Sequence, residues 1–165
     1  MPQDAELTPR PDGIKAWDEL GDDEKALYER QMEVYAGFYE FADAQIGRII
    51  DAIEQTGELD NTLIIFIAGD NGASAEGSMT GTASAVAMLN GVQFPLEETM
   101  KFKDRWGEAG TDVHYAVGWS WAMNTPFKWM KQVASHFGGT RNPMVISWPA
   151  RIKDTGGAAL PVPPH

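Results

Sequence analysis

The chain has 165 residues, with 13 lysines and arginines against 24 aspartates and glutamates, which gives a formal net charge of −11. This balance excludes nucleic acid as the principal partner, because phosphate binding needs clustered cations. Hydrophobic residues make up 43% of the chain, enough for one domain-sized core and too many for a disordered acidic tail. Cysteine is absent, which excludes disulfides, thiolate metal ligands and a cysteine nucleophile.

A long amphipathic helix is predicted first along the chain. From Asp22 to about Ile53, apolar side chains recur every three or four residues. Asp43 falls on the apolar stripe, so we expect it to face a packed neighbour and to hold the fold rather than to act in catalysis. Gly37 and Gly47 weaken a helix, so we expect close packing to compensate at both positions.

A buried strand is predicted next, over 62–68, where the residues are almost all apolar and rich in β-branched side chains. This apolar run is far shorter than the roughly 20 residues that cross a bilayer, so no membrane span is expected. The stretch 69–122 is glycine-rich and reads as irregular. A short helix is predicted from Thr125-Pro126 to Ser135, and a second buried strand over Met144–Trp148. A helix that feeds a buried strand indicates an α/β layer architecture, and two strands are few for a complete domain.

The pair Asp70-Asn71 directly follows the first predicted strand, at the end where open α/β sheets place their ligands. A carboxylate oxygen beside an amide oxygen suits a hard cation such as Ca²⁺ or Mg²⁺. The same Asn71-Gly72 sequence is also typical of a plain turn, although no alternating strand follows it. Both interpretations stay open on the residues alone.

A second candidate segment carries Lys128 and Lys131 ahead of the pair Gly138-Gly139. Paired glycines allow a backbone to approach an anion closely, and the lysines would neutralise it. Solvated surface lysines are the ordinary alternative. His114 and His136 are interpreted as hydrogen-bonded structural histidines, outside any active site.

The order of segments resembles the sulfatases of the alkaline-phosphatase-like superfamily, most closely the bacterial arylsulfatases. The resemblance covers most of residues 17–155. The segments that carry it are Gln31-Met-Glu-Val-Tyr-Ala36, Asp43-Ala-Gln-Ile-Gly47, Asp60-Asn-Thr-Leu-Ile-Ile65, Gly69-Asp-Asn-Gly-Ala-Ser74, Gly118-Trp-Ser-Trp-Ala122, Asn124-Thr-Pro-Phe127, Lys131-Gln-Val-Ala-Ser-His-Phe-Gly-Gly-Thr-Arg141 and Val145-Ile-Ser-Trp-Pro149.

The resemblance implies roles for three residues. Asp70 and Asn71 would be two ligands of an active-site cation, usually Ca²⁺, with Mg²⁺ as the alternative. Lys131 would contact the sulfate group, with Lys128 as the fallback. Sulfatases use a formylglycine, made from Cys or Ser in a Cys/Ser-x-Pro-x-Arg sequence, as the nucleophile. We expect this nucleophile, and the aspartates that complete the metal shell, only in a missing N-terminal half.

We therefore interpret residues 1–165 as one partial sulfatase catalytic domain, with an extended arm over 1–16, a family-like core over 17–155 and a tail over 156–165. The complete parent would hydrolyse small sulfate esters, and this chain would be inactive alone. A phosphoester or phosphonate hydrolase of the same superfamily, and a non-catalytic acidic binding module, are the alternatives. The expected protein partners are the missing half or a second copy, and the cellular location stays open.

Overall fold

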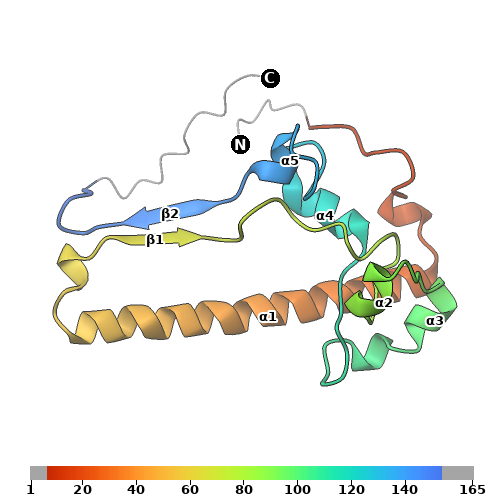
Figure 1. Cartoon of the computed structure of the whole chain (residues 1–165), viewed down its shortest axis with the longest axis horizontal. Helices are drawn as coiled ribbons and strands as arrows, with labels where there is room; N and C mark the ends of the chain where they lie inside the picture. Colours follow the sequence, from red (N-terminus) through yellow and green to blue (C-terminus); the bar gives the residue numbers. More distant parts are fainter. Residues whose placement is uncertain (1–6, 154–165) are drawn as a thin grey trace.

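The computed structural model of this chain describes residues 7–153, and its longest element is a single helix. Helix α1 runs over Asp22–Gln55 and lies along the whole molecule (Figure 1). Three acidic residues occupy its first turn, where the helix dipole favours negative charge, and Glu24 accepts a hydrogen bond from the backbone N–H of Gly21 at 2.9 Å. A short 3₁₀ turn, Trp17–Glu19, precedes it. The helix predicted from the apolar periodicity is confirmed.

The sheet has two antiparallel strands, β1 over Ile64–Ile67 and β2 over Met144–Ser147. A 3₁₀ turn, Leu59–Asn61, joins α1 to β1. Both predicted strands are present, but the prediction that they are buried is wrong in this chain. Ile65 is 53% exposed and Val145 is 61% exposed. The reason is that, among the described residues, each strand pairs only with the other, and no further layer covers this two-stranded sheet.

Short helices fill the stretch that the sequence indicated as irregular, and a fifth helix precedes β2. They are α2 (Ala85–Leu89), α3 (Leu96–Met100), the 3₁₀ turn Lys103–Arg105, α4 (Val117–Asn124) and α5 (Phe137–Thr140). The helix predicted over 125–135 is wrong. That segment consists of turns, and Trp129 and Gln132 have φ angles of 65° and 78°, a left-handed conformation that an α-helix cannot include.

The core lies where the first half of α1 meets the loops and short helices that follow β1. Leu27 of α1 packs with Ala83 and Trp106, and all three are buried. Gln31, one turn further along α1, is 1% exposed. The side-chain Nε2 of Gln31 donates to the Thr80 carbonyl at 2.7 Å, and its Oε1 accepts from the Ala116 backbone N–H at 2.9 Å. One buried side chain thus ties α1 to two separate loops.

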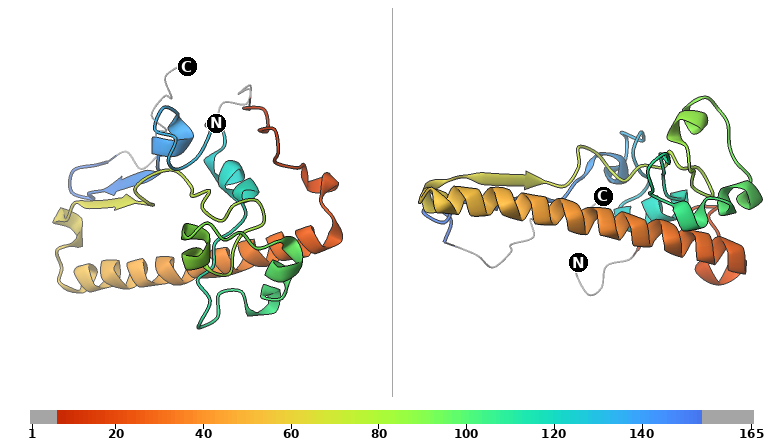
Figure 2. Two further views of the ribbon diagram at one scale, coloured as in Figure 1. Left: turned by 45° about the vertical axis from the view of Figure 1, so that its right-hand side comes forward. Right: turned by 90° about the horizontal axis from the view of Figure 1, so that it is seen from below.

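The middle of α1 is exposed, and two expectations for it are wrong. Neither Gly37 nor Gly47 has any atom within 4 Å of the position that a Cβ would occupy, so close packing does not explain them. Asp43 lies on the solvent side rather than against a packed neighbour. Figure 2 shows this part of the helix leading away from the short helices toward the two-stranded sheet.

These elements confirm the α/β prediction. The expected arm is without helix or strand over 7–16, its first six residues lie outside the described part, and so does the tail over 156–165. Within residues 7–153, no helix combines the length and apolar character that crossing a bilayer requires.

Candidate functional site

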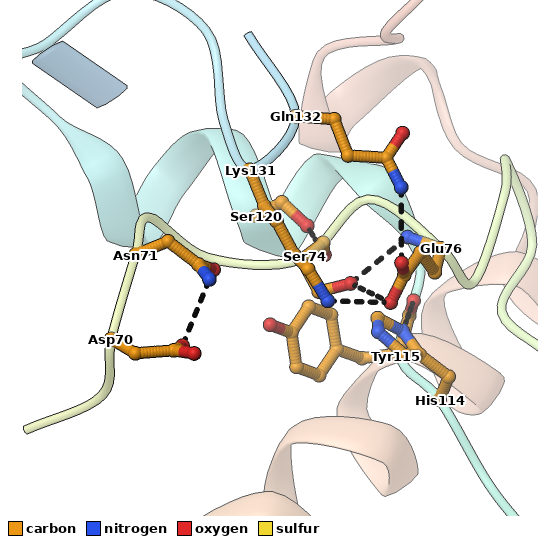
Figure 3. A network of polar contacts seen from close by, with 9 residues as sticks. All are labelled: Asp70, Asn71, Ser74, Glu76, His114, Tyr115, Ser120, Lys131 and Gln132. Atoms are coloured by element: carbon orange, nitrogen blue, oxygen red, sulfur yellow. Dashed lines mark hydrogen bonds and ion pairs between the residues drawn. The ribbon is translucent and has the colours of Figure 1, made fainter. Parts of the chain in front are cut away.

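The Asp70-Asn71 turn lies just beyond the carboxyl end of β1. Gly69 turns the chain there with a φ of 100°, a conformation that favours glycine. The Asn71 side-chain amide donates to Oδ1 of Asp70 at 2.8 Å, so the two groups lie side by side (Figure 3). Asp70 is exposed and Asn71 is partly exposed. The placement at a strand end, expected from the sequence, is confirmed.

Backbone contacts fix this turn against the segment that precedes β2. The Gly72 N–H donates to the Gly139 carbonyl at 3.1 Å. With its amide oriented so that both polar atoms are satisfied, the Asn142 side chain accepts from the Asn71 backbone N–H at 2.8 Å and donates to the Asn71 carbonyl. The backbone of Asn71 is therefore held on both of its polar groups by one side chain.

The loop that carries Lys131 (the lysine loop) lies against the loop that follows β1 (the strand-end loop). The Lys131 backbone N–H donates to the Ala73 carbonyl at 3.0 Å. Asn124, at the end of α4, bridges the two loops: its Oδ1 accepts from the Ala73 N–H at 3.0 Å, and its Nδ2 donates to the Trp129 carbonyl at 3.1 Å. Ser120, one turn earlier on α4, donates to the Ser74 carbonyl. Helix α4 thus presents two polar side chains to the strand-end loop, and one of them, Asn124, also joins that loop to the lysine loop.

The glycine pair Gly138-Gly139 is a packing device in this chain, not an open cradle for an anion. A Cβ on Gly138 would lie 2.0 Å from the Trp129 carbonyl oxygen and 2.3 Å from that of Lys128. A Cβ on Gly139 would lie 2.3 Å from the Val133 carbonyl oxygen. Both glycines are buried, and the absence of side chains is what lets the lysine loop close over them.

The Lys131 ammonium is held by an acidic residue that the sequence did not single out. Lys131 Nζ lies 3.0 Å from Oε2 of Glu76. Glu76 also accepts from the Ser74 hydroxyl at 2.9 Å and from the Gln132 amide at 3.0 Å. The hydrogen bond from Lys131, followed by that from Ser74, holds the pKa of Glu76 below its usual value of 4.5. Nothing in the spacing of Glu76 marks it as the partner of a lysine 55 residues away.

Lys128, the alternative to Lys131, lies elsewhere. Its side chain is exposed and lines a separate cavity of about 520 Å³ with Thr8, Ser135 and His136. His114 has its Nδ1 3.0 Å from the Tyr115 carbonyl oxygen, which agrees with a structural histidine. Of the two candidate lysines, Lys131 is the one whose backbone N–H bonds to the strand-end loop.

The donor chemistry at the turn fits part of a cation site. Asp70 and Asn71 carry the hard oxygen ligands that Ca²⁺ and Mg²⁺ prefer, at an accessible loop. Ca²⁺ takes about six to eight oxygens, and the described residues hold no group of three or more His, Cys, Asp or Glu that could bind a metal ion. The turn can supply two ligands, and further ligands have to come from other groups.

One sequence bears on the missing nucleophile: Ser147-Trp148-Pro149-Ala150-Arg151 has the Ser-x-Pro-x-Arg form. The expectation that this sequence form occurs only in a missing N-terminal half is therefore wrong. Ser147 pairs with Ile64, at the end of β1 opposite to Asp70. The strand between Ile64 and Ile67 alone spans about 10 Å at roughly 3.3 Å per residue, so Ser147 cannot reach a group bound at the Asp70-Asn71 turn.

Comparisons with known proteins identify the family of this chain. A family model described as Sulfatase matches residues 5–160. An uncharacterised sulfatase of Schizosaccharomyces pombe is 38% identical over 141 residues, which cover 86% of this chain and 24% of the yeast protein. An arylsulfatase of Klebsiella aerogenes is 30% identical over 143 residues, which cover 82% of this chain and 27% of that enzyme. The chain thus spans about a quarter of the length of these relatives, and it belongs to the sulfatase family.

Proposed function

We propose that this chain forms part of an arylsulfatase-like catalytic domain of the alkaline-phosphatase-like superfamily that hydrolyses small sulfate esters. One observation carries the proposal: the oxygen-bearing Asp70-Asn71 turn and the lysine loop are joined backbone to backbone, by the 3.0 Å hydrogen bond from Lys131 to Ala73. A cation ligand pair and a cationic side chain on adjoining loops suit a sulfate ester, whose oxygens carry negative charge and whose leaving group gains it as the bond breaks.

In this proposal Asp70 and Asn71 hold Ca²⁺, or Mg²⁺, through one carboxylate and one amide oxygen. The bound cation would stabilise negative charge on the sulfate oxygens. Lys131 binds the sulfate by donating hydrogen bonds from its ammonium. The Lys131 side chain is 33% exposed, so it interacts more strongly than a fully solvated lysine. The cation that the two ligands hold would orient the ester, and the lysine would neutralise the negative charge of its sulfate group.

The nucleophile and the remaining ligands come from outside the described residues in this proposal. The chain has no cysteine, and Ser147 lies at the wrong end of β1. A formylglycine from a further sulfatase segment, on the same or another polypeptide, would complete the site. The 165-residue chain alone is therefore expected to bind ligand without turning it over.

Terbium luminescence tests the cation step, because Tb³⁺ substitutes for Ca²⁺ and tryptophan sensitises its emission. Asp70→Ala should weaken Tb³⁺ and Ca²⁺ binding at least about tenfold, the loss that removing even an outer-shell partner produces. Asp43→Ala, on the exposed face of α1, is the matched control and should bind as the unsubstituted chain does. Equal affinity in all three proteins would contradict the assignment of Asp70.

Hydrolysis of an aryl sulfate by the purified chain tests the need for an external nucleophile. We expect no turnover with or without Ca²⁺. Robust Ca²⁺-dependent turnover by residues 1–165 would show that the chain holds its own nucleophile and would refute this part of the proposal. Turnover of an aryl phosphate but not of the aryl sulfate would favour the phosphoester hydrolase over the sulfatase.

A further inference from the structure

Glu76 connects the two loops of the candidate site by side-chain contacts alone. Its Oε2 accepts from Lys131 Nζ at 3.0 Å and from the Ser74 hydroxyl at 2.9 Å, and its Oε1 accepts from Gln132 Nε2 at 3.0 Å. Its own backbone N–H donates to the Ser74 hydroxyl oxygen at 3.2 Å. Figure 3 shows the carboxylate at the centre of this group, with the ends of the Lys131 and Gln132 side chains pointing at it.

This ion pair differs from the others in what it joins. Within residues 7–153, the remaining ion pairs link residues no more than nine positions apart, and each has at least one side chain that is more than half exposed. The Lys131–Glu76 pair links residues 55 positions apart, and its side chains are 33% and 30% exposed. A partly shielded pair between two loops constrains their relative position, whereas an exposed pair within one helix does not.

The geometry leaves Lys131 able to bind an anion while it is held. A lysine ammonium has three N–H donors and a flexible four-carbon stem. One donor is taken by Glu76, and two remain. Because the stem has many rotamers, a fixed acceptor at one donor orients the other two and reduces the conformational entropy that anion binding would otherwise remove.

The backbone next to Lys131 also depends on this contact. Trp129 and Gln132 adopt positive φ angles, which non-glycine residues rarely do without support from their surroundings. Glu76 binds the side chains of Lys131 and Gln132 together, one on each carboxylate oxygen. The same carboxylate therefore stabilises the turn and places the ammonium.

We propose that Glu76 is a positioning residue for Lys131: its carboxylate, fixed by Ser74 and Gln132, holds the ammonium in place so that two of its N–H donors bind the sulfate oxygens. This inference rests on the proposed function for the role of sulfate. The contact between Glu76 and Lys131 itself does not depend on it.

Competitive labelling of amines with acetic anhydride, read by mass spectrometry, tests the inference on the 165-residue chain with inorganic sulfate as the probe. In Glu76→Ala and Glu76→Gln, Lys131 should label faster by a factor of about 2 to 10, as expected on losing a partly exposed ion pair. Glu98→Gln, which frees Lys101 from an exposed pair, is the matched control and should leave Lys131 unchanged. Unchanged labelling of Lys131 in both Glu76 variants would overturn the inference.

Protection of Lys131 by sulfate in the presence of Ca²⁺ gives the second measurement. Glu76→Ala should need about tenfold more sulfate for half-protection, and Glu76→Gln, which keeps an acceptor oxygen for the ammonium, should lie between it and the unsubstituted chain. Tighter sulfate binding by both variants would identify Glu76 as a competitor for the ammonium and overturn the inference. No protection in the unsubstituted chain would refute the sulfate role of Lys131, and the labelling rates without sulfate would then still decide whether Glu76 holds it.

Discussion

Replacing Gly138, in the glycine pair before β2, by alanine would have two opposite effects on the stability of the chain: a gain in helix propensity and a loss from steric overlap. Gly138 lies in the short helix α5, and replacing a helical glycine by alanine ordinarily stabilises a protein by about 1 kcal/mol. Here the added Cβ would lie 2.0 Å from the Trp129 carbonyl oxygen and 2.3 Å from that of Lys128. Both are backbone atoms, so no side-chain rotation relieves the contact.

We therefore expect Gly138→Ala to destabilise the chain. Overpacking of a well-filled site costs about 1 to 3 kcal/mol, and contacts this short with backbone lie at the upper end. After the gain in helix propensity is subtracted, the net loss is about 2 kcal/mol, which lowers the melting temperature by about 4 to 8 °C for a chain of this size. Urea unfolding followed by tryptophan fluorescence measures the loss.

Gly37→Ala is the matched control, because nothing lies within 4 Å of its Cβ position in the exposed part of α1. It should stabilise the chain by about 0.5 to 1 kcal/mol. The two alanine variants thus differ in sign. If Gly138→Ala is as stable as the unsubstituted chain, the lysine loop does not pack on Gly138. The described packing of this loop over the glycine pair would then be wrong.

Three further predictions concern buried or partly buried polar groups. Gln31→Leu should lower the free energy of unfolding by about 2 to 4 kcal/mol in urea titrations, because it leaves the Thr80 carbonyl and the Ala116 N–H without their partner; a loss below 1 kcal/mol would contradict this. The hydrogen bond from Lys131 lowers the pKa of Glu76 in the folded state, so the stabilisation is present above the ordinary value of 4.5 and is lost as the pH falls through the lower folded value. The stability advantage over Glu76→Gln should therefore shrink on acidification, and a constant difference would refute it. Burial, with a smaller contribution from the charge of Glu24, raises the pKa of Tyr28 to about 12. Burial raises the pKa values of Tyr35 and Tyr115 as well, so the late tyrosine ionisation seen by absorbance at 295 nm should lose one tyrosine's amplitude in Tyr28→Phe, and an unchanged late amplitude would contradict this.

The sequence predicted the parts of this fold that depend on local pattern. The helix over Asp22–Gln55 and the strands at Ile64 and Met144 follow from periodicity and β-branched composition, which act within a few residues. The position of Asp70-Asn71 follows from the strand before it. Strand burial was not predictable in the same way, because it depends on which other elements cover the sheet.

The support of the candidate site depends on contacts between distant segments. Glu76 meets a lysine 55 residues away, and Asn124 contacts Ala73 across 51 residues. Asn124 begins one of the segments that carry the family resemblance, and Glu76 follows another, but nothing in their spacing indicates the distant partner that each contacts. The predicted helix over 125–135 failed for a related reason: the close approach of the glycine pair and the hydrogen bonds to Asn124 and Glu76 favour turns there over the local helical pattern.

The exposure of the middle of α1 has a consequence for local unfolding. A helical segment with few tertiary contacts is only marginally stable in water, whereas the first turns of α1 are fixed by Leu27 and Gln31. Amide hydrogen exchange should therefore be slow near Gln31 and fast around Phe38 and Phe41, within one continuous helix. The Asp70-Asn71 turn lies between the slowly and the rapidly exchanging parts. The strand-end loop that contains it is hydrogen-bonded to the protected part through α4, and the turn is continuous with the exposed strand β1. Whatever covers that strand would slow exchange at the turn as well, so exchange rates there report on assembly of the domain.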